Sequence, residues 1–154
     1  MRRTVFATLA VLALILFFGA LAFPAIATCS REDQSLANWF HNDTILFFGW
    51  MAILLGQWGW MANIPFLINV VLLIRGRRTG FWSPGIQAFF LAAAVMTLLP
   101  SWGMRLPHNE AWDEPVCWLG AGFWLWVAAQ ALVCAAAVAA TLILPRRPKP
   151  AAQP

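Results

Sequence analysis

The chain has 154 residues, of which 62% are hydrophobic and 10% are charged. Soluble domains contain roughly 45–50% apolar and about 25% charged residues, so this chain cannot cover itself with a polar surface in water. The formal charge of +4 comes from basic residues clustered beside long apolar stretches, where they act as topology signals. The composition predicts one membrane-embedded unit and no nucleic-acid partner.

Four stretches that contain no charged residue and no histidine predict four transmembrane helices, at about residues 4–27, 44–74, 81–102 and 116–144. Each reaches the roughly 20 residues that a helix needs to cross a hydrocarbon core about 30 Å thick. A segment in lipid must also satisfy its own backbone hydrogen bonds, which favours helix. We expect residues 1–145 to form a single all-α, four-transmembrane-helix bundle. The basic, proline-rich residues 146–154 are expected to form a disordered tail.

The first stretch has features of a secretory signal as well as of a membrane anchor. Arg2 and Arg3 precede an apolar run that ends in Ala25-Ile26-Ala27, which has the A-x-A form of a cleavage site. The run is longer than the ~7–15 apolar residues of a usual signal, which favours an uncleaved helix. Cleavage before Thr28, or lipid attachment at Cys29, is the alternative, and either would leave three spans.

The second stretch carries small and polar residues three or four positions apart, which places them on one helical stripe: Gly49, Ala52, Gly56, Gly59 and Asn63. Small residues allow two membrane helices to approach closely. We therefore expect this stripe to pack against other helices. Asn63 is expected to hydrogen-bond to Gln87 or Gln130 on a neighbouring helix.

A kink is expected in the second stretch, because a helix of this length exceeds the thickness of the membrane. Pro65 lacks a backbone N–H and disfavours helix at Ile64, so the bend should lie just before it. An ordinary packing kink is the simpler interpretation. A ligand site on an unwound turn is the alternative.

The segment from Gly56 to Arg78 contains Trp60-Met61-Ala62-Asn63-Ile64-Pro65, followed by an apolar run and Arg75-Gly76-Arg77-Arg78. It resembles small uncharacterised bacterial inner-membrane proteins with a W-x-A-N-(x)-P transmembrane segment that ends in arginines. In this chain Ile64 separates the asparagine from the proline. The resemblance implies a location in the inner membrane and no particular activity.

The fourth stretch contains Gly120, Gly122 and an alanine series near one face, which we expect to pack closely: Ala128, Ala131, Ala135 and Ala139. Tryptophans are expected at the membrane boundaries, with Trp82 at the inner one and others at the outer one. Deeper tryptophans, such as Trp58, Trp60, Trp124 and Trp126, either fill the bundle or stack on a quinone.

The charged residues predict the orientation. Lys and Arg gather before the first stretch, between the second and third, and after the fourth: Arg2, Arg3, Arg75, Arg77, Arg78, Arg146, Arg147 and Lys149. All the acidic residues fall in the other two loops: Glu32, Asp33, Asp43, Glu110, Asp113 and Glu114. Because basic loops stay on the cytoplasmic side, both termini are predicted to be cytoplasmic.

The sequence contains few candidate redox, metal-binding or catalytic residues. Cys29 and Cys117 fall in or beside the outer loops, where an oxidising compartment favours a disulfide. A structural bridge is the preferred interpretation over a redox centre, because the chain has no C-x-x-C pair. Two histidines and two carboxylates are weak metal candidates: His41, Asp43, His108 and Glu110. The sequence predicts no catalytic residue and no cofactor.

The predicted function is that of a non-enzymatic accessory or assembly subunit in a bacterial inner membrane, with the lipid bilayer and a second copy or a larger membrane complex as partners. Ion-coupled transport is disfavoured because the spans contain no ionisable group. One alternative is a redox or metal-dependent enzyme at the periplasmic face. Another is a binder of a neutral lipid or quinone in a cleft near Pro65.

Overall fold

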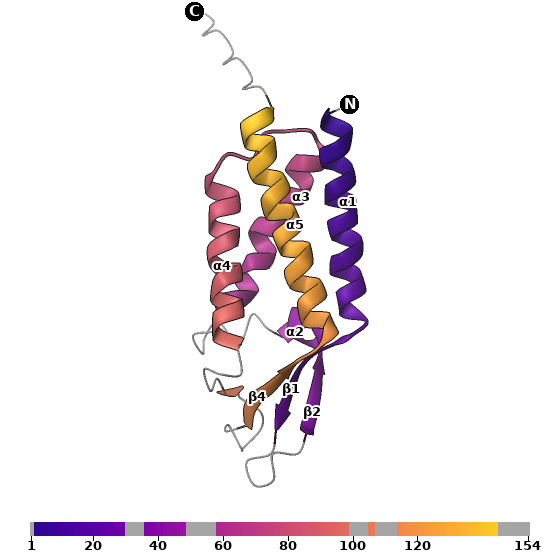
Figure 1. Cartoon of the computed structure of the whole chain (residues 1–154), viewed down its shortest axis with the longest axis vertical. Coiled ribbons are helices and arrows are strands. Elements are labelled where there is room, and N and C mark those ends of the chain that lie inside the picture. The colour runs from indigo at the N-terminus through magenta and orange to yellow at the C-terminus, as the bar shows by residue number, and fades with distance from the viewer. Residues whose placement is uncertain (1, 30–35, 49–57, 99–104, 107–113, 145–154) are drawn as a thin grey trace, which may run out of the picture.

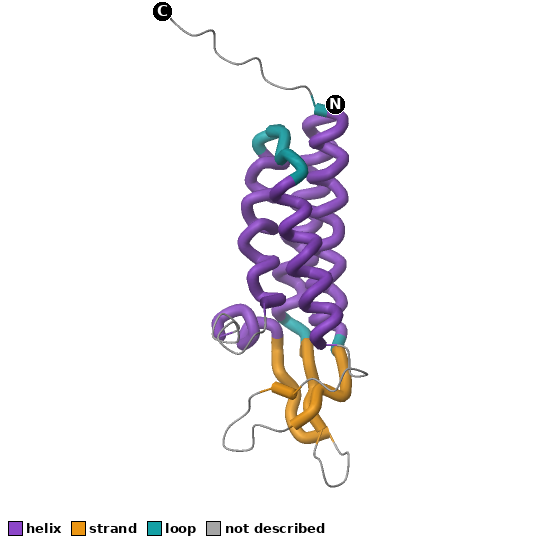
Figure 2. The backbone as a smooth tube through the Cα atoms, turned by 90° about the vertical axis from the view of Figure 1, so that its left-hand side faces the viewer, coloured by secondary structure: helices purple, strands orange, loops and turns teal. Residues whose placement is uncertain are grey.

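A computed structural model describes residues 2–29, 36–48, 58–98, 105–106 and 114–144. Long helices stand side by side, and a small sheet lies at one end of them (Figures 1 and 2). The helices are α1 (Arg2–Leu21), α2 (Asn42–Phe48), the 3-10 helix η2 (Trp58–Ala62), α3 (Asn63–Ile74), α4 (Trp82–Leu98) and α5 (Ala121–Ile143). The described part of the chain is therefore mostly helical. Helix α1 begins and helix α5 ends at the end of the bundle away from the sheet (Figure 1).

The sheet was not predicted from the sequence. It consists of β1 (Pro24–Cys29), β2 (Leu36–His41), β3 (Arg105–Leu106) and β4 (Glu114–Leu119), in the order β2-β1-β4-β3. Strand β1 pairs antiparallel with both β2 and β4, so that Ala27 lies opposite Trp39 on one side and Trp118 on the other. The fold class is thus not all-α, because a strand ladder adjoins the bundle.

The predicted helix boundary at Ala27 is wrong, because α1 ends at Leu21 and residues 24–29 form a strand. Pro24 lacks a donor for a helical hydrogen bond and disfavours helical geometry at Phe23. Five successive residues of β1, from Ala25 to Cys29, are buried. The absence of charge in this stretch therefore reflects burial in a central strand. Residues 116–119 also belong to a strand, β4, so that α5 begins only at Ala121.

The second predicted helix is divided in the structure. Helix α2 lies at the sheet end of the bundle (Figure 1), residues 49–57 lie outside the described ranges, and η2 leads directly into α3. Pro65 is the third residue of α3. The first four N–H groups of a helix have no partner within it, so a proline at this position costs no helical hydrogen bond. The change from 3-10 to α geometry falls between Ala62 and Asn63, just before the proline.

The main core lies where α1, α3 and α5 meet. Residues on one face of α1 are buried at helical spacing: Phe6, Ala10, Ala13, Phe17 and Ala20. Phe17 stacks on Phe66 of α3, with the ring centroids 5.0 Å apart. The neighbouring side of α5 supplies small residues, including Ala129 and Ala136. Alternating large and small side chains let these three helices interlock.

The outer faces of the helices are apolar. Exposed large apolar side chains occur on α1, α3 and α4: Val5, Val11, Leu12, Ile15, Phe18, Ile64, Leu67, Ile68, Val71, Ile74, Trp82, Ile86, Phe89 and Met96. By length and composition, Arg2–Leu21 and Ala121–Ile143 are candidate membrane spans, and Trp58–Ile74 and Trp82–Met96 are shorter apolar helices.

Most of the alanine series that we expected to pack closely does not lie on the inner face of α5. Ala128, Ala131 and Ala135 are exposed and Ala139 is half-buried against the main core, whereas the buried alanines are Ala129, Ala136, Ala137 and Ala140. The buried side of α5 is the side that carries Gly122, Gln130 and Thr141. Alanines surround much of this helix, so alanine alone did not identify the inner face. We call the exposed set, Ala128, Ala131 and Ala135, the alanine face.

Candidate functional site

Polar side chains gather in the interior of the bundle, between three helices. Six of them form what we call the amide network, with two from each helix: Asn63 and Asn69 of α3, Ser83 and Gln87 of α4, and Trp126 and Gln130 of α5. Asn69, Gln87 and Gln130 have no exposed surface, and Asn63 is 7% exposed. An amide carries both a donor and an acceptor, so amides can be linked one to the next without any charge.

The network is continuous. The Oδ1 atom of Asn63 accepts hydrogen bonds from Trp126 Nε1 at 2.9 Å and from Gln130 Nε2 at 3.0 Å. Gln87 Nε2 donates to the side-chain oxygen of Gln130 at 2.9 Å and to its backbone oxygen at 3.0 Å.

At the other end of the network, Asn69 Nδ2 donates to Gln87 Oε1 at 2.7 Å, and Ser83 Oγ donates to Asn69 Oδ1 at 2.7 Å. Among the described residues, no buried side-chain nitrogen or oxygen lacks a hydrogen-bond partner. The donors and acceptors of the network are therefore directed at each other. Such a cluster fixes the register of three helices, because sliding one helix would leave buried polar groups without hydrogen-bond partners.

The expected bond between Asn63 and a neighbouring glutamine is confirmed for Gln130, while Gln87 joins through Gln130. Sequence reasoning missed the bond between Asn69 and Gln87 and the contribution of Ser83. A signal was present, because Asn69 and Gln87 are each nine positions from Arg78, in the connection between α3 and α4. Two antiparallel helices joined at that turn bring such positions opposite each other.

A second set of polar contacts lies at the end of the bundle away from the sheet. The hydroxyl of Thr79 is 2.9 Å from both the backbone oxygen of Ala137 and the hydroxyl of Thr141. Thr141 Oγ1 is also 3.1 Å from the backbone oxygen of Gly80. These contacts attach the connection between α3 and α4 to the last part of α5.

The junction between the bundle and the sheet depends on two glycines. A Cβ atom at Gly120 would overlap the backbone oxygen of Pro24, and one at Gly122 would overlap the backbone oxygen of Phe23. Beside them, Asn42 Nδ2 donates to the backbone oxygen of Ala20 at 3.0 Å, which satisfies a carbonyl at the end of α1. The corner between α1 and β1 is thereby packed tightly against the start of α5.

Cys29 and Cys117, the pair expected from the sequence, are joined by a disulfide, with an S–S distance of 2.10 Å and Cα atoms 5.9 Å apart. The bridge connects β1 and β4, which already pair through Ile26, Ala27 and Thr28. The two cysteines are 88 residues apart in sequence. Their bond therefore closes a long loop of the unfolded chain and restricts the conformations of the unfolded state. Cys134, on α5, is free.

The predicted small-residue stripe is only partly within the described ranges. Gly59, in η2, lies against α4 so closely that a Cβ atom would be 2.5 Å from the Cβ of Ala94. Asn63 belongs to the amide network. Gly49, Ala52 and Gly56 lie outside the described residues.

The metal candidates are not assembled in the described part of the chain. His41 ends β2 and is exposed, and Asp43 lies in the first turn of α2. His108 and Glu110 fall outside the described residues. No group of three or more His, Cys, Asp or Glu residues within the described ranges is placed to hold a metal ion.

Two of the deeper tryptophans use their indole N–H groups inside the protein. Trp60 Nε1 donates to the backbone oxygen of Leu46 at 3.0 Å, and Trp126 belongs to the amide network. Trp58 and Trp124 are about half exposed, at 51% and 50%. A groove of about 360 Å³ lies instead at the start of α1, lined by Thr4, Val5, Thr8 and Leu9.

The described part of the chain thus combines an internally satisfied amide network, a disulfide-linked sheet and apolar outer faces. Comparison of the chain with protein-family models, with curated proteins and with solved structures finds no match.

Proposed function

We propose that this protein is an integral protein of a bacterial inner membrane, that it crosses the bilayer four times, and that it serves as a non-enzymatic accessory or assembly subunit. The apolar outer faces of the helices support the first part of the proposal. In water, an exposed apolar surface of this extent would drive association. A lipid bilayer solvates it without cost.

The lengths of the helices are compatible with four spans. Helix α1 has 20 residues and α5 has 23. Helix α4 has 17 residues, and η2 followed by α3 adds 5 and 12 residues, which is also 17. Spanning helices have roughly 17–25 residues, so the two shorter ones reach the lower limit. The tightly packed η2–α4 pair then lies within the bilayer.

Two independent signals support the proposed orientation. The arginines of α1 and of the connection between α3 and α4 lie at the end away from the sheet (Figure 1), which favours a cytoplasmic location for that end. The sheet contains the disulfide between Cys29 and Cys117, and disulfides persist in oxidising compartments such as the periplasm. The two signals assign opposite ends of the molecule to opposite sides of the membrane.

Retention of the first segment is supported by its packing. Helix α1 contributes Phe6, Ala10, Ala13 and Phe17 to the main core, and β1 is a central strand of the sheet. Cleavage before Thr28 would remove the whole helix and most of that strand. This packing favours the uncleaved form.

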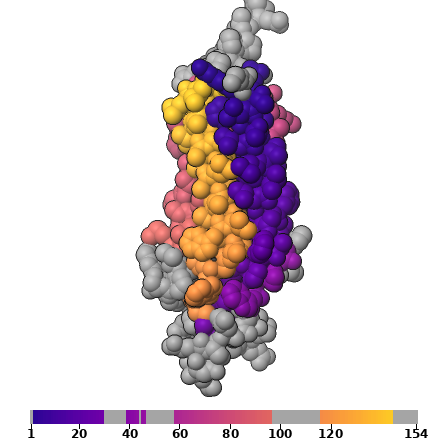
Figure 3. Space-filling model, turned by 45° about the vertical axis from the view of Figure 1, so that its right-hand side comes forward, coloured from indigo at the N-terminus to yellow at the C-terminus, as the bar shows by residue number. Residues whose placement is uncertain are grey.

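The alanine face of α5 carries the proposal of a subunit role. Ala128, Ala131 and Ala135 are exposed, and the surface of α5 runs uncovered beside α1 along the bundle (Figure 3). Small residues at this spacing let membrane helices associate by close contact. The amide network offers no competing site for a solute, since its groups bind each other. We therefore propose that α5 receives a helix of a second copy or of a larger complex.

Native mass measurement of the full-length protein in a mild detergent tests this proposal. We expect a polypeptide that retains its first segment, has an oxidised Cys29–Cys117 pair, and is found in a complex with further copies or with other membrane proteins. Ala131→Phe should dissociate that complex, because a bulky ring prevents close helix contact. Ala88→Phe, at an exposed position of α4, is the control and should leave it intact.

Two results would contradict the proposal. One is a monomer with nothing bound to it, and the other is a mature chain that starts at Thr28. Equal dissociation by the two phenylalanine variants would show that the alanine face of α5 has no special role in association.

A further inference from the structure

The connection between α3 and α4 has a defined conformation that holds three arginines in place. Gly76 adopts a φ of +59°, and the backbone N–H groups of Gly76 and Arg77 donate to the oxygens of Leu73 at 2.9 Å and Leu72 at 2.8 Å. This is the Schellman arrangement that ends a helix at a glycine. Arg75 and Arg77 are exposed, and Arg78 is half-buried.

The first turn of α1 packs on this connection. A Cβ atom at Gly76 would lie 3.0 Å from Cδ and 3.2 Å from Cγ of Arg3, so the aliphatic part of the arginine covers the glycine. On its other side, the connection is attached to α5 through Thr79 and Thr141. Five arginines from two parts of the chain are therefore held at one end of the bundle: Arg2, Arg3, Arg75, Arg77 and Arg78. We call this set the arginine end.

The arginine end has no carboxylate side chain close to it in sequence. All six acidic residues lie between residues 32 and 43 or between residues 110 and 114. The two within described elements, Asp43 in α2 and Glu114 in β4, belong to the sheet end of the molecule (Figure 1). Positive charges gathered at one end of a molecule repel each other unless anions neutralise them. The first turn of α1 adds the partial positive charge of a helix N-terminus.

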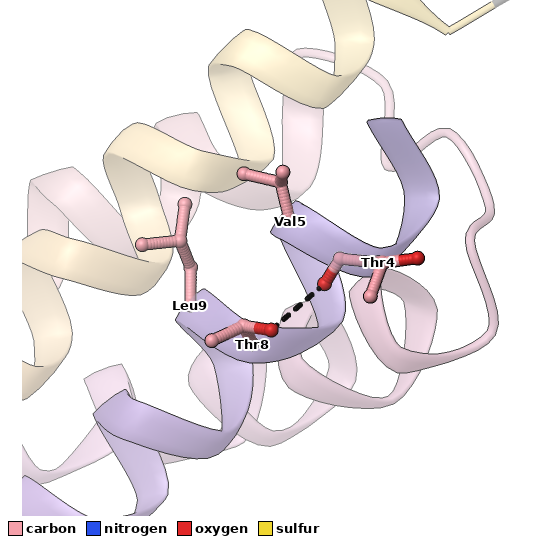
Figure 4. A pocket seen from close by; sticks show the side chains of 4 residues that line it. All are labelled: Thr4, Val5, Thr8 and Leu9. Atoms are coloured by element: carbon pink, nitrogen blue, oxygen red, sulfur yellow. Dashed lines mark hydrogen bonds between the residues drawn. The ribbon is translucent and has the colours of Figure 1, made fainter. Parts of the chain in front are cut away.

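An apolar groove begins directly after these arginines. Thr4, Val5, Thr8 and Leu9 line it over the first turns of α1, and its volume is about 360 Å³ (Figure 4). The Thr8 hydroxyl donates to the backbone oxygen of Thr4 at 3.0 Å. The proton of that hydroxyl is therefore already used within the helix, and the groove mainly presents carbon atoms. Arg2 precedes Val5 by about one helical turn, so a positively charged residue lies at the end of the groove nearest the start of α1.

We propose that the arginine end and this groove bind one anionic phospholipid, with its phosphate at Arg2 and the neighbouring arginines and one acyl chain in the groove along α1. The inference rests on the proposed membrane location of the helices. An anionic headgroup matches the cations of the arginine end, beside which the described elements place no carboxylate, and a hydrocarbon chain matches the groove. Basic sites beside transmembrane helices on the cytoplasmic side select anionic headgroups on the same grounds.

The test is titration of the full-length, delipidated protein in detergent with phosphatidylglycerol or phosphatidylcholine, with bound lipid counted by native mass spectrometry. We expect phosphatidylglycerol to bind more tightly than phosphatidylcholine. Arg2→Gln should weaken phosphatidylglycerol binding about fivefold, which is the contribution of one arginine at an anionic membrane surface. It should leave phosphatidylcholine binding unchanged.

The groove is tested separately. Thr8→Phe should fill it and weaken the binding of phosphatidylglycerol, whereas Val11→Phe, at an exposed position of α1 that does not line the groove, should not. Glycerol phosphate, which lacks acyl chains, distinguishes a lipid from a free phosphate as the ligand. It should compete only weakly with phosphatidylglycerol.

Three results would overturn the lipid site: equal binding of the two lipids, equal effects of Thr8→Phe and Val11→Phe, or full competition by glycerol phosphate, which would indicate an anion site without a lipid. The same spectra report the association of the wild-type chain. Loss of lipid selectivity with association intact would refute the lipid site alone, whereas a monomer that still selects the anionic lipid would refute the subunit role alone.

Discussion

Gly122→Ala is expected to destabilise the protein by about 1–3 kcal/mol, because the added methyl group overpacks the corner between α1, β1 and α5. The methyl carbon would overlap the backbone oxygen of Phe23 and would lie 2.9 Å from both the backbone oxygen of Pro24 and Asn42 Nδ2. Two of these three atoms are backbone atoms of the turn between α1 and β1. To move them would disturb the central strand of the sheet and the bond from Asn42 to Ala20.

The measurement is the free energy of unfolding of the detergent-solubilised protein, with denaturation followed by circular dichroism. Gly19→Ala is the matched control, because a Cβ atom at Gly19 meets nothing within 4 Å. The control should be neutral or slightly stabilising, since alanine is the better helix former. Equal stability of the two variants would show that the α1–β1 corner is not packed against α5.

Gln130→Met is expected to destabilise the bundle by roughly 1–3 kcal/mol, which is the cost of leaving buried polar groups without partners. Methionine has nearly the same volume as glutamine but cannot donate to Asn63 or accept from Gln87. Both of those bonds would be lost, although Gln87 would keep its bond to the backbone oxygen of residue 130. Leu142→Met, at a position of α5 that is 69% exposed, should have little effect.

A double-mutant cycle that combines Gln130→Met with Asn63→Leu separates the energy of the interaction between the two side chains from the packing energy of each one. Since the two side chains share a hydrogen bond, their substitutions should be non-additive by about 0.5–3 kcal/mol. Strict additivity would mean that the two side chains do not interact, and the proposed role of the amide network in helix register would then fail.

Features that depend on apolar length or on rare residues could be predicted from the sequence. Cysteines are few, so Cys29 and Cys117 were readily paired. Glutamine and asparagine are conspicuous within apolar stretches, so Asn63 and Gln130 could be linked. Each of these predictions rests on the chemistry of the residues themselves: a polar side chain in an apolar stretch needs a hydrogen-bond partner, and two cysteines in neighbouring segments can form a disulfide.

The sheet and the inner face of α5 could not be predicted, for a physical reason in each case. A buried central strand and a transmembrane helix are both free of charge, so the composition of residues 24–27 did not distinguish them. Pro24 was the available signal for the end of the helix. On α5, alanine occurs on both the buried and the exposed sides, and the partners on other helices decide which alanines are buried.

The proposed four-span topology is tested most directly by labelling single cysteines in intact cells. In a Cys134→Ser background, which leaves the disulfide pair in place, a cysteine replaces either Arg77 or Asp43, and a membrane-impermeant maleimide is added. With four spans and cytoplasmic termini, we expect the cysteine at position 43 to react from outside and the one at position 77 to react only after the membrane is permeabilised. Reaction at position 77 in intact cells, or a protein that stays soluble without detergent, would contradict this topology.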